Sequence, residues 1–140
     1  MKSSLLLGSF LAALGAVALT GCSTVKLDES GEMRAAYVAG EFRMLVNSNA
    51  PTTARATSEA FRQLGLFQIR NDLGTYDAEL AARTALDEKV RVNIREVNSR
   101  QTEVRIRVDI IGDKNYSRKL FDQIERNLTV SAGAVTGGGW

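Results

Sequence analysis

The strongest constraint on the fold comes from two segments in which apolar and polar residues alternate. In residues 89–97, Val90, Val92 and Ile94 fall on one parity and Arg91, Asn93 and Arg95 on the other. In residues 102–111, the apolar parity holds Val104, Ile106, Val108 and Ile110, and the polar parity holds Glu103, Arg105, Arg107 and Asp109. Such alternation is typical of strands with one buried and one solvated face. Residues 98–101 (NSRQ) suit a turn between the two segments. The pattern predicts a β-hairpin in an antiparallel sheet with one wet face.

The polar parity of this hairpin is rich in arginine. Matching the apolar faces predicts a register that pairs Val92 with Val108 and sets Arg91 opposite Asp109, a favourable cross-strand pair. Four arginines then share the polar face, namely Arg91, Arg95, Arg105 and Arg107. Because arginine suits bidentate contacts with oxyanions, this face is a candidate docking surface for a phosphate, a glycan or an acidic partner.

A competing interpretation of the arginines is a solvated sheet face that needs no ligand. Nearby acids would then neutralise much of the positive charge; the candidates are Glu79, Glu96, Glu103 and Asp109. The acidic residues elsewhere have neither the spacing of a calcium loop nor a predicted cleft, so they are interpreted as turn and strand-face residues. These are Asp72, Asp77, Glu79, Asp87 and Glu88.

The segments before the hairpin predict a strand, a helix and another strand. Residues 36–46 alternate, and Gly40 falls on their apolar parity, where another segment can pack closely. Ser48 or Asn49 can cap the helix that follows, and Pro51 suits its first turn. Its buried stripe is Ala54, Thr57, Phe61 and Leu64, and Gly65 ends it.

Extended structure restarts at residues 67–70, and residues 71–74 carry a turn signal before an alternating strand at 76–82. After the hairpin, Asp113 or Asn115 can cap a last helix with a buried stripe of Leu120, Phe121, Ile124 and Leu128. The resulting order over residues 35–128 is strand, helix, three strands, helix. We therefore expect an α+β two-layer sandwich, with a four-stranded antiparallel sheet and both helices on one face.

The N-terminal segment has a different character. Lys2 is followed by an uncharged stretch too short for a membrane-spanning helix, which needs roughly 20 apolar residues, so it is interpreted as a cleaved export signal. The stretch ends in Leu19-Thr20-Gly21-Cys22, which resembles the bacterial lipobox. We expect cleavage between Gly21 and Cys22 and a diacylglycerol on the Cys22 thiol, the alternative being a plain secretory signal with an unrelated cysteine.

These assignments divide the chain into four parts. Residues 1–21 form the signal peptide, 22–34 a flexible tether, 35–128 the domain, and 129–140 a disordered Gly-rich tail. Ser23 after the cysteine favours the outer membrane, because an Asp there is the inner-membrane signal in enterobacterial-style sorting. We therefore expect a lipid-anchored protein at the outer membrane that faces the periplasm.

The composition of the 140 residues argues against an enzyme. The sequence has no His and one Cys, which removes the commonest general base, an intrachain disulfide and a thiolate zinc site. Ser117 has no His to activate it and is expected in the first turn of the last helix. No metal or other cofactor is expected. A formal net charge of +2 does not favour nucleic-acid binding.

Several segments resemble a family of small bacterial lipoproteins. They are residues 83–90 (RTALDEKV), residues 102–108 (TEVRIRV) and Gly112-Asp113-Lys114 with Ser117 and Ile124. The family is domain of unknown function 3568, and the resemblance covers residues 36–128 and includes the lipobox. Leu86-Asp87-Glu88 stands where family members often have Asp-Gly, which makes that turn less tight. The resemblance implies the compartment and the fold, and it brings no catalytic residues.

Two functions remain as expectations. The first is a non-enzymatic outer-membrane lipoprotein that works as an interaction or structural module of the cell envelope, with an unidentified envelope protein as partner. The second is binding of an anionic ligand, such as lipopolysaccharide or a phosphorylated glycan, through the arginine-rich sheet face.

Overall fold

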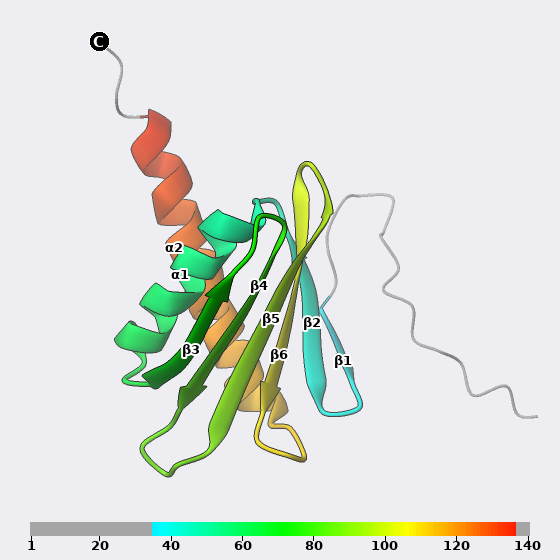
Figure 1. Cartoon of the computed structure of the whole chain (residues 1–140), viewed down its shortest axis with the longest axis vertical. Helices are drawn as coiled ribbons and strands as arrows, with labels where there is room; N and C mark the ends of the chain where they lie inside the picture. Colours follow the sequence, from blue (N-terminus) through cyan, green and yellow to red (C-terminus); the bar gives the residue numbers. More distant parts are fainter. Residues whose placement is uncertain (1–34, 137–140) are drawn as a thin grey trace, which may run out of the picture.

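A computed structural model describes residues 35–136 of the chain, so the predicted export signal, Cys22 and the predicted tether lie outside the described residues. One antiparallel sheet of six strands carries both helices on the same face (Figure 1). The strand order across the sheet is β1-β2-β6-β5-β4-β3. The elements are β1 (Ala36–Val38), β2 (Glu41–Val46), α1 (Ala50–Gln63), β3 (Phe67–Leu73), β4 (Asp77–Arg83), β5 (Lys89–Asn98), β6 (Gln101–Val108) and α2 (Lys114–Thr136).

The prediction of a four-stranded sheet is wrong, although the α+β class and the antiparallel pairing hold. The predicted strand at 36–46 is a hairpin of β1 and β2, which turns at Ala39 and Gly40. Both turn residues have positive φ, 51° and 78°. Two-residue hairpin turns with positive φ at both positions usually contain Asn, Asp or Gly there. Because Ala39 occupies the first position, the sequence does not predict this turn.

The second additional strand is β3, which runs through the turn predicted at residues 71–74. The reversal comes later, where the Gly74 N–H donates to the carbonyl oxygen of Asp77 at 2.9 Å. A β-bulge at Ile69 gives the strand one extra residue relative to β4. The polar triplet Arg70, Asn71 and Asp72 lies within the strand because β3 is an edge strand and all its residues are exposed.

The hairpin of β5 and β6 is confirmed, but its predicted register is wrong by two residues. Val92 pairs with Ile106, and Arg91 lies opposite Arg107 instead of Asp109. The tight turn at Ser99 and Arg100 pairs Asn98 with Gln101, and a regular ladder from there would place apolar residues of β5 opposite polar residues of β6. A bulge between Glu96 and Asn98 restores the match of apolar faces in a register that the alternation alone does not distinguish.

The core lies between the sheet and the two helices. Helix α1 packs on β3, β4 and β5, and α2 packs on β2 and β6. The rings of Phe42 and Phe121 join β2 to α2 with their centroids 5.4 Å apart. The predicted stripes of both helices are confirmed, since Ala54, Thr57, Phe61, Leu120, Phe121 and Ile124 are buried.

The last helix is longer than expected. Asp113 caps it, since its Oδ1 accepts a hydrogen bond from the Tyr116 N–H at 2.9 Å. The helix continues to Thr136, so residues 129–136 are helical where a disordered tail was expected from residue 129. Its last turns project past α1 (Figure 1). Neither helix of the described part, residues 35–136, is long and apolar enough to cross a membrane.

Two glycines allow the β1–β2 turn to touch the loop that leads from β6 into α2. A Cβ on Gly40 would lie 2.3 Å from the Ile111 carbonyl oxygen, and a Cβ on Gly112 would lie 2.2 Å from the Gly40 carbonyl oxygen. Gly112 also has a positive φ of 91°. The close packing predicted at Gly40 is therefore present, and its partner is backbone.

Candidate functional site

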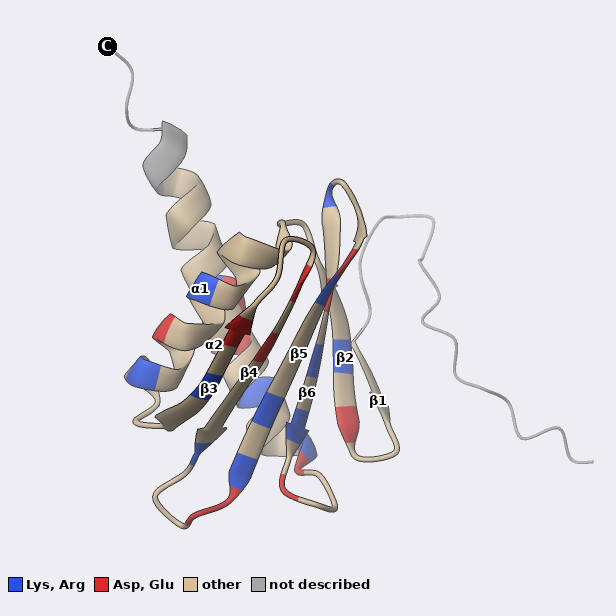
Figure 2. Ribbon diagram, in the orientation of Figure 1, with Lys and Arg blue, Asp and Glu red and all other residues tan. Residues whose placement is uncertain are grey.

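The sheet face opposite the helices is charged from one side to the other, and we call it the open face. Alternation along the strands brings acids and arginines of five strands onto it, so both signs of charge lie close together (Figure 2). Its charged and amide residues include Glu41, Arg43, Arg70, Asp72, Asp77, Glu79, Arg83, Lys89, Arg91, Asn93, Arg95, Glu103, Arg105 and Arg107.

The four arginines predicted to share a face do share it, and Arg43, Arg70 and Arg83 join them. Arg43 of β2 lies directly opposite Arg105 of β6. Arg70 comes from β3, the strand that the sequence analysis did not count. The signal for Arg43 was present in the polar parity of residues 41–46, but its neighbour became known only with the pairing of β2 and β6.

Three of these seven arginines are held in ion pairs with acids of the same face. Arg105 Nη2 lies 2.6 Å from a Glu103 carboxylate oxygen, and the Glu103 hydrogen bond is the main reason that the pKa of Arg105 is raised. Glu41 lies 3.2 Å from Arg43 Nε. Arg70 lies 3.0 Å from Glu79, whose hydrogen bond raises the pKa of Arg70.

Of the four acids expected to neutralise the predicted arginines, Glu103 alone forms an ion pair with one of them in the described part of the chain, and its partner is Arg105. Glu79 pairs with Arg70 and Glu103 with Arg105. Glu96 lies next to α1, where its Oε1 accepts a hydrogen bond from the Ala50 N–H at 2.9 Å. Asp109 follows the end of β6 at a positive φ of 57°. In the described part of the chain, Arg91 and Arg95 therefore have no carboxylate within ion-pair distance.

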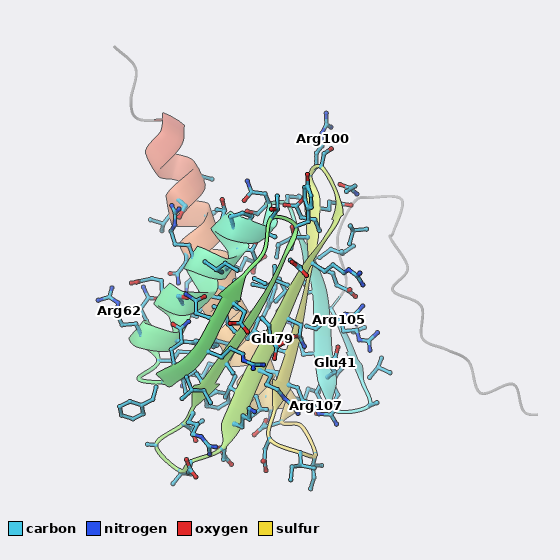
Figure 3. The ribbon with its side chains drawn as sticks, in the orientation of Figure 1. Glu41, Arg62, Glu79, Arg100, Arg105 and Arg107 are labelled. Atoms are coloured by element: carbon cyan, nitrogen blue, oxygen red, sulfur yellow. The ribbon has the colours of Figure 1, made fainter. Side chains whose placement is uncertain are left out.

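Arg91 and Arg107 bring two guanidinium groups together on the open face. They lie directly opposite each other, and like charges in that position destabilise a sheet. Arg107 Nη2 donates to the Ile110 carbonyl oxygen at 3.0 Å, which fixes its position. A shallow hollow of about 290 Å³ lies between them and Glu41, Glu79, Asn93 and Arg105. Figure 3 shows Glu41, Glu79, Arg105 and Arg107 over this part of the sheet.

Arg95 borders a second hollow, of about 480 Å³, nearer the turn between β3 and β4. Asp72, Asp77 and Glu79 also line it, so this hollow carries more negative charge than the first. In the register of the sheet Arg95 stands between Asp77 and Glu103. The surroundings of Arg95 thus differ from those of Arg91, although both side chains are exposed on one strand.

The remaining sequence candidates do not form a reactive site. Ser117 is fully buried in the first turn of α2, and its hydroxyl donates to the Asp113 carbonyl oxygen at 2.6 Å. Asp87 lies in the turn between β4 and β5 and pairs with Arg83 at 2.9 Å. Among residues 35–136, no three His, Cys, Asp or Glu side chains gather in a way that could hold a metal ion.

The fold and the open face together define a small α+β protein in which two helices cover one sheet face and leave the other, charged face uncovered. The chain matches the family described as "Protein of unknown function (DUF3568)" over residues 5–127. Because the match covers most of the 140 residues, the protein belongs to this family, as the resemblance of its strand and turn segments implied. A search of curated proteins found no match.

Proposed function

We propose that this protein is a lipid-anchored, non-enzymatic module of the bacterial cell envelope. In this proposal Cys22 carries the lipid, and the domain faces the periplasm from the outer membrane. The four residues Leu19-Thr20-Gly21-Cys22 support the anchor, since they follow an uncharged stretch of the length of an export signal. The family match covers residues 5–127 and so includes these four residues.

A two-chain lipid on Cys22 would hold the protein at a membrane without a spanning helix, because one acyl chain alone binds only marginally. Replacing Cys22 by Ala should abolish labelling by a radioactive fatty acid and release the protein from the membrane fraction. A matched Ser23→Ala variant should keep both properties. A Cys22→Ala protein that still sediments with outer membranes would contradict the proposed anchor.

The open face is the part of the domain that would bind an envelope partner. The observation that carries this proposal is that neither helix covers it, while acids and arginines alternate across five of its strands. A surface with both signs of charge suits a protein partner with a complementary pattern, because charge patterns select partners and register. Its shallow hollows contain carboxylates and guanidinium groups and no hydroxyl or thiol nucleophile.

Site-specific photocrosslinking in intact cells tests this role. A photoreactive side chain at Asn93, in the middle of the open face, should give one discrete protein adduct. The same side chain at Arg55, exposed on α1, should give none. The absence of an adduct at Asn93, or identical adducts at both positions, would contradict a partner on the open face.

Binding of an anionic ligand is a second candidate, favoured by one specific observation. Arg91 and Arg107 face each other across β5 and β6 without a carboxylate on Arg91. A phosphate between them would relieve their repulsion and accept charge-assisted hydrogen bonds. The phosphates of lipopolysaccharide are the envelope anions that we consider for this site.

Purified lipopolysaccharide is the probe for this second function. Arg91→Gln should weaken binding by about tenfold, since a hydrogen bond to a charged group contributes about 1.5 kcal/mol or more. Arg55→Gln removes the same charge from α1 and should leave binding unchanged. Equal losses in the two variants would mean that only the net charge matters, and the Arg91 site would be rejected.

A further inference from the structure

The strand β3 leaves one edge of the sheet without a neighbour in the described part of the chain. All seven of its residues are exposed, and they include large apolar side chains. Phe67 is 69% exposed, Ile69 51% and Leu73 61%. An exposed edge strand offers unpaired N–H and C=O groups to another strand, and proteins ordinarily protect such edges.

The hydrogen-bond pattern identifies which backbone groups point outward. The Gly74 N–H donates to the Asp77 carbonyl oxygen, so this pair closes the hairpin of β3 and β4. In an antiparallel ladder, hydrogen-bonded and non-hydrogen-bonded pairs alternate along the strands. Asp72 therefore faces β4, whereas the N–H and C=O groups of Asn71 and Leu73 face away from the sheet.

The charges next to Asn71 are arranged symmetrically. Arg70 precedes it and Asp72 follows it, and both lie on the open face, where they contact each other at 3.3 Å. If a second β3 ran antiparallel with Asn71 opposite Asn71, each Arg70 would face an Asp72 of the other copy. A shift of two residues either way would instead set Arg70 opposite Arg70 or Asp72 opposite Asp72, which is destabilising.

The same register also suits the backbone and the apolar side chains. Asn71 of each copy would exchange both backbone hydrogen bonds with Asn71 of the other, on the two-fold axis. Leu73 of one copy would lie next to the bulge at Ile69 of the other, so two exposed apolar side chains lie at the interface. Both helical layers would stay on one side of the combined sheet, because opposed residues of an antiparallel pair point to the same face.

We infer that two copies of this protein associate through β3, antiparallel and centred on Asn71, into one continuous sheet of twelve strands. The occupant of the edge is a second copy because β3 is self-complementary in charge. This interface uses Arg70 and Asp72 at the β3 margin of the open face and leaves Arg91 and Asn93 in its middle uncovered, so either idea can fail without the other. It would direct the two open faces to the same side.

Cross-linking through the symmetry axis is the first test. At a hydrogen-bonded antiparallel pair the Cα atoms are about 5.5 Å apart, within the range of a disulfide. Asn71→Cys in the full chain should therefore give a covalent dimer under mild oxidation. The matched variant Ser99→Cys, at the exposed tip of the β5–β6 hairpin, should not. The unaltered chain controls for links through Cys22, its one native cysteine.

Charge reversal with rescue is the second test. Arg70→Asp and Asp72→Arg each create like-charge pairs across the two-fold axis, and each should weaken the dimer about tenfold in analytical ultracentrifugation. The double variant Arg70→Asp/Asp72→Arg restores opposite charges and should recover the dimer. Both residues are exposed, and thermal melts of all three variants verify that the fold is retained.

Three results would overturn the inference. The first is a chain that stays monomeric up to about 100 μM, a concentration at which even weak specific pairing is populated. The second is a dimer whose dissociation constant in both single reversals equals that of the unaltered chain. The third is an Asn71→Cys chain that cross-links to a different protein and never to itself, which would assign the edge to a foreign strand.

Discussion

Glu96 in β5 accepts a hydrogen bond at 2.9 Å from the backbone N–H of Ala50, the first residue of α1. The Thr52 N–H donates to the Asn49 side chain, the Thr53 N–H donates to the Asn49 carbonyl oxygen, and Pro51 has no N–H. All N–H groups of the first turn are therefore satisfied or absent, although helices normally leave them without intrahelical partners. Glu96 thus attaches the start of α1 to the sheet and places a negative charge at the positive end of the helix.

Replacing Glu96 by Ala should lower the free energy of unfolding by about 1–2 kcal/mol, because it removes a charged acceptor from the helix N-terminus. The control is Glu125→Ala on the exposed side of α2, which should change it by less than about 0.5 kcal/mol. Urea denaturation followed by circular dichroism measures both. Equal effects of the two substitutions would show that the contact with Ala50 contributes nothing.

Opposite effects are expected from the same substitution at Arg91 and Arg95. Arg91 lies opposite Arg107, so Arg91→Glu replaces a like-charge pair by an attractive one and should raise the free energy of unfolding by about 0.5 kcal/mol. Arg95 lies between Asp77 and Glu103, so Arg95→Glu should lower it by a similar amount. Both differences should shrink in 1 M salt, which screens exposed charges.

A rise in stability for Arg91→Glu would mean that the native Arg91 is retained at a cost. Residues that lower stability in this way are typical of binding sites. If instead both variants were destabilised equally, repulsion between Arg91 and Arg107 would not be a feature of the folded sheet.

Alanine substitutions at two glycines with positive φ distinguish the cost of backbone strain from the cost of a steric clash. Gly65 has φ of 69° and open space where a Cβ would stand, so Gly65→Ala should cost only about 1 kcal/mol for the left-handed conformation. Gly40 has φ of 78° and the Ile111 carbonyl oxygen 2.3 Å from a Cβ. Gly40→Ala should therefore cost at least about 2 kcal/mol more than Gly65→Ala, measured by chemical denaturation.

The stability of the domain should decrease at high pH because of Tyr116. Burial first, and the negative charge of Glu88 second, raise the pKa of its phenol. An unfolded Tyr ionises near pH 10, so the stabilisation is complete below that pH and is lost as the pH rises above it. Tyr116→Phe should flatten this decrease between about pH 9 and 11. A decrease of the same slope in Tyr116→Phe would contradict this origin.

Local periodicity was sufficient to predict both helices and the β5–β6 hairpin. Ala54, Thr57 and Phe61 lie on the same side of a helix, so their spacing predicts which face of α1 is buried. The N-cap residue Asn49 marks where the helix begins. The alternation of β5 and β6 fixed which side chains are buried, but not the register. A shift of two residues keeps every parity, so the bulge at Val97 decided the pairing of Arg91.

The two missed strands differ in cause. The turn between β1 and β2 depends on Ala39 in a conformation that alanine seldom adopts, and the close approach of Gly40 to Ile111 involves a segment far away in the sequence. The strand β3 carries polar residues because it lies at an edge, where burial does not select apolar ones. The sequence predicted the face that carries the arginines, but not the partners of the nearby acids. Glu96, for example, binds the start of α1, and this contact joins segments far apart in the sequence.

The central position of β6 has a consequence for how the chain reaches its fold. Phe42 pairs with Ile106, so the first hairpin cannot join the sheet until nearly the whole chain is available. Closure of such a long loop carries an entropic cost before the contacts form, and sheets with distant pairings fold slowly. The β1–β2 hairpin and the β3–β4–β5 meander therefore do not contact each other in one sheet until β6 pairs between them and α2 packs on β2 and β6. Folding is thus completed by the C-terminal part of the domain.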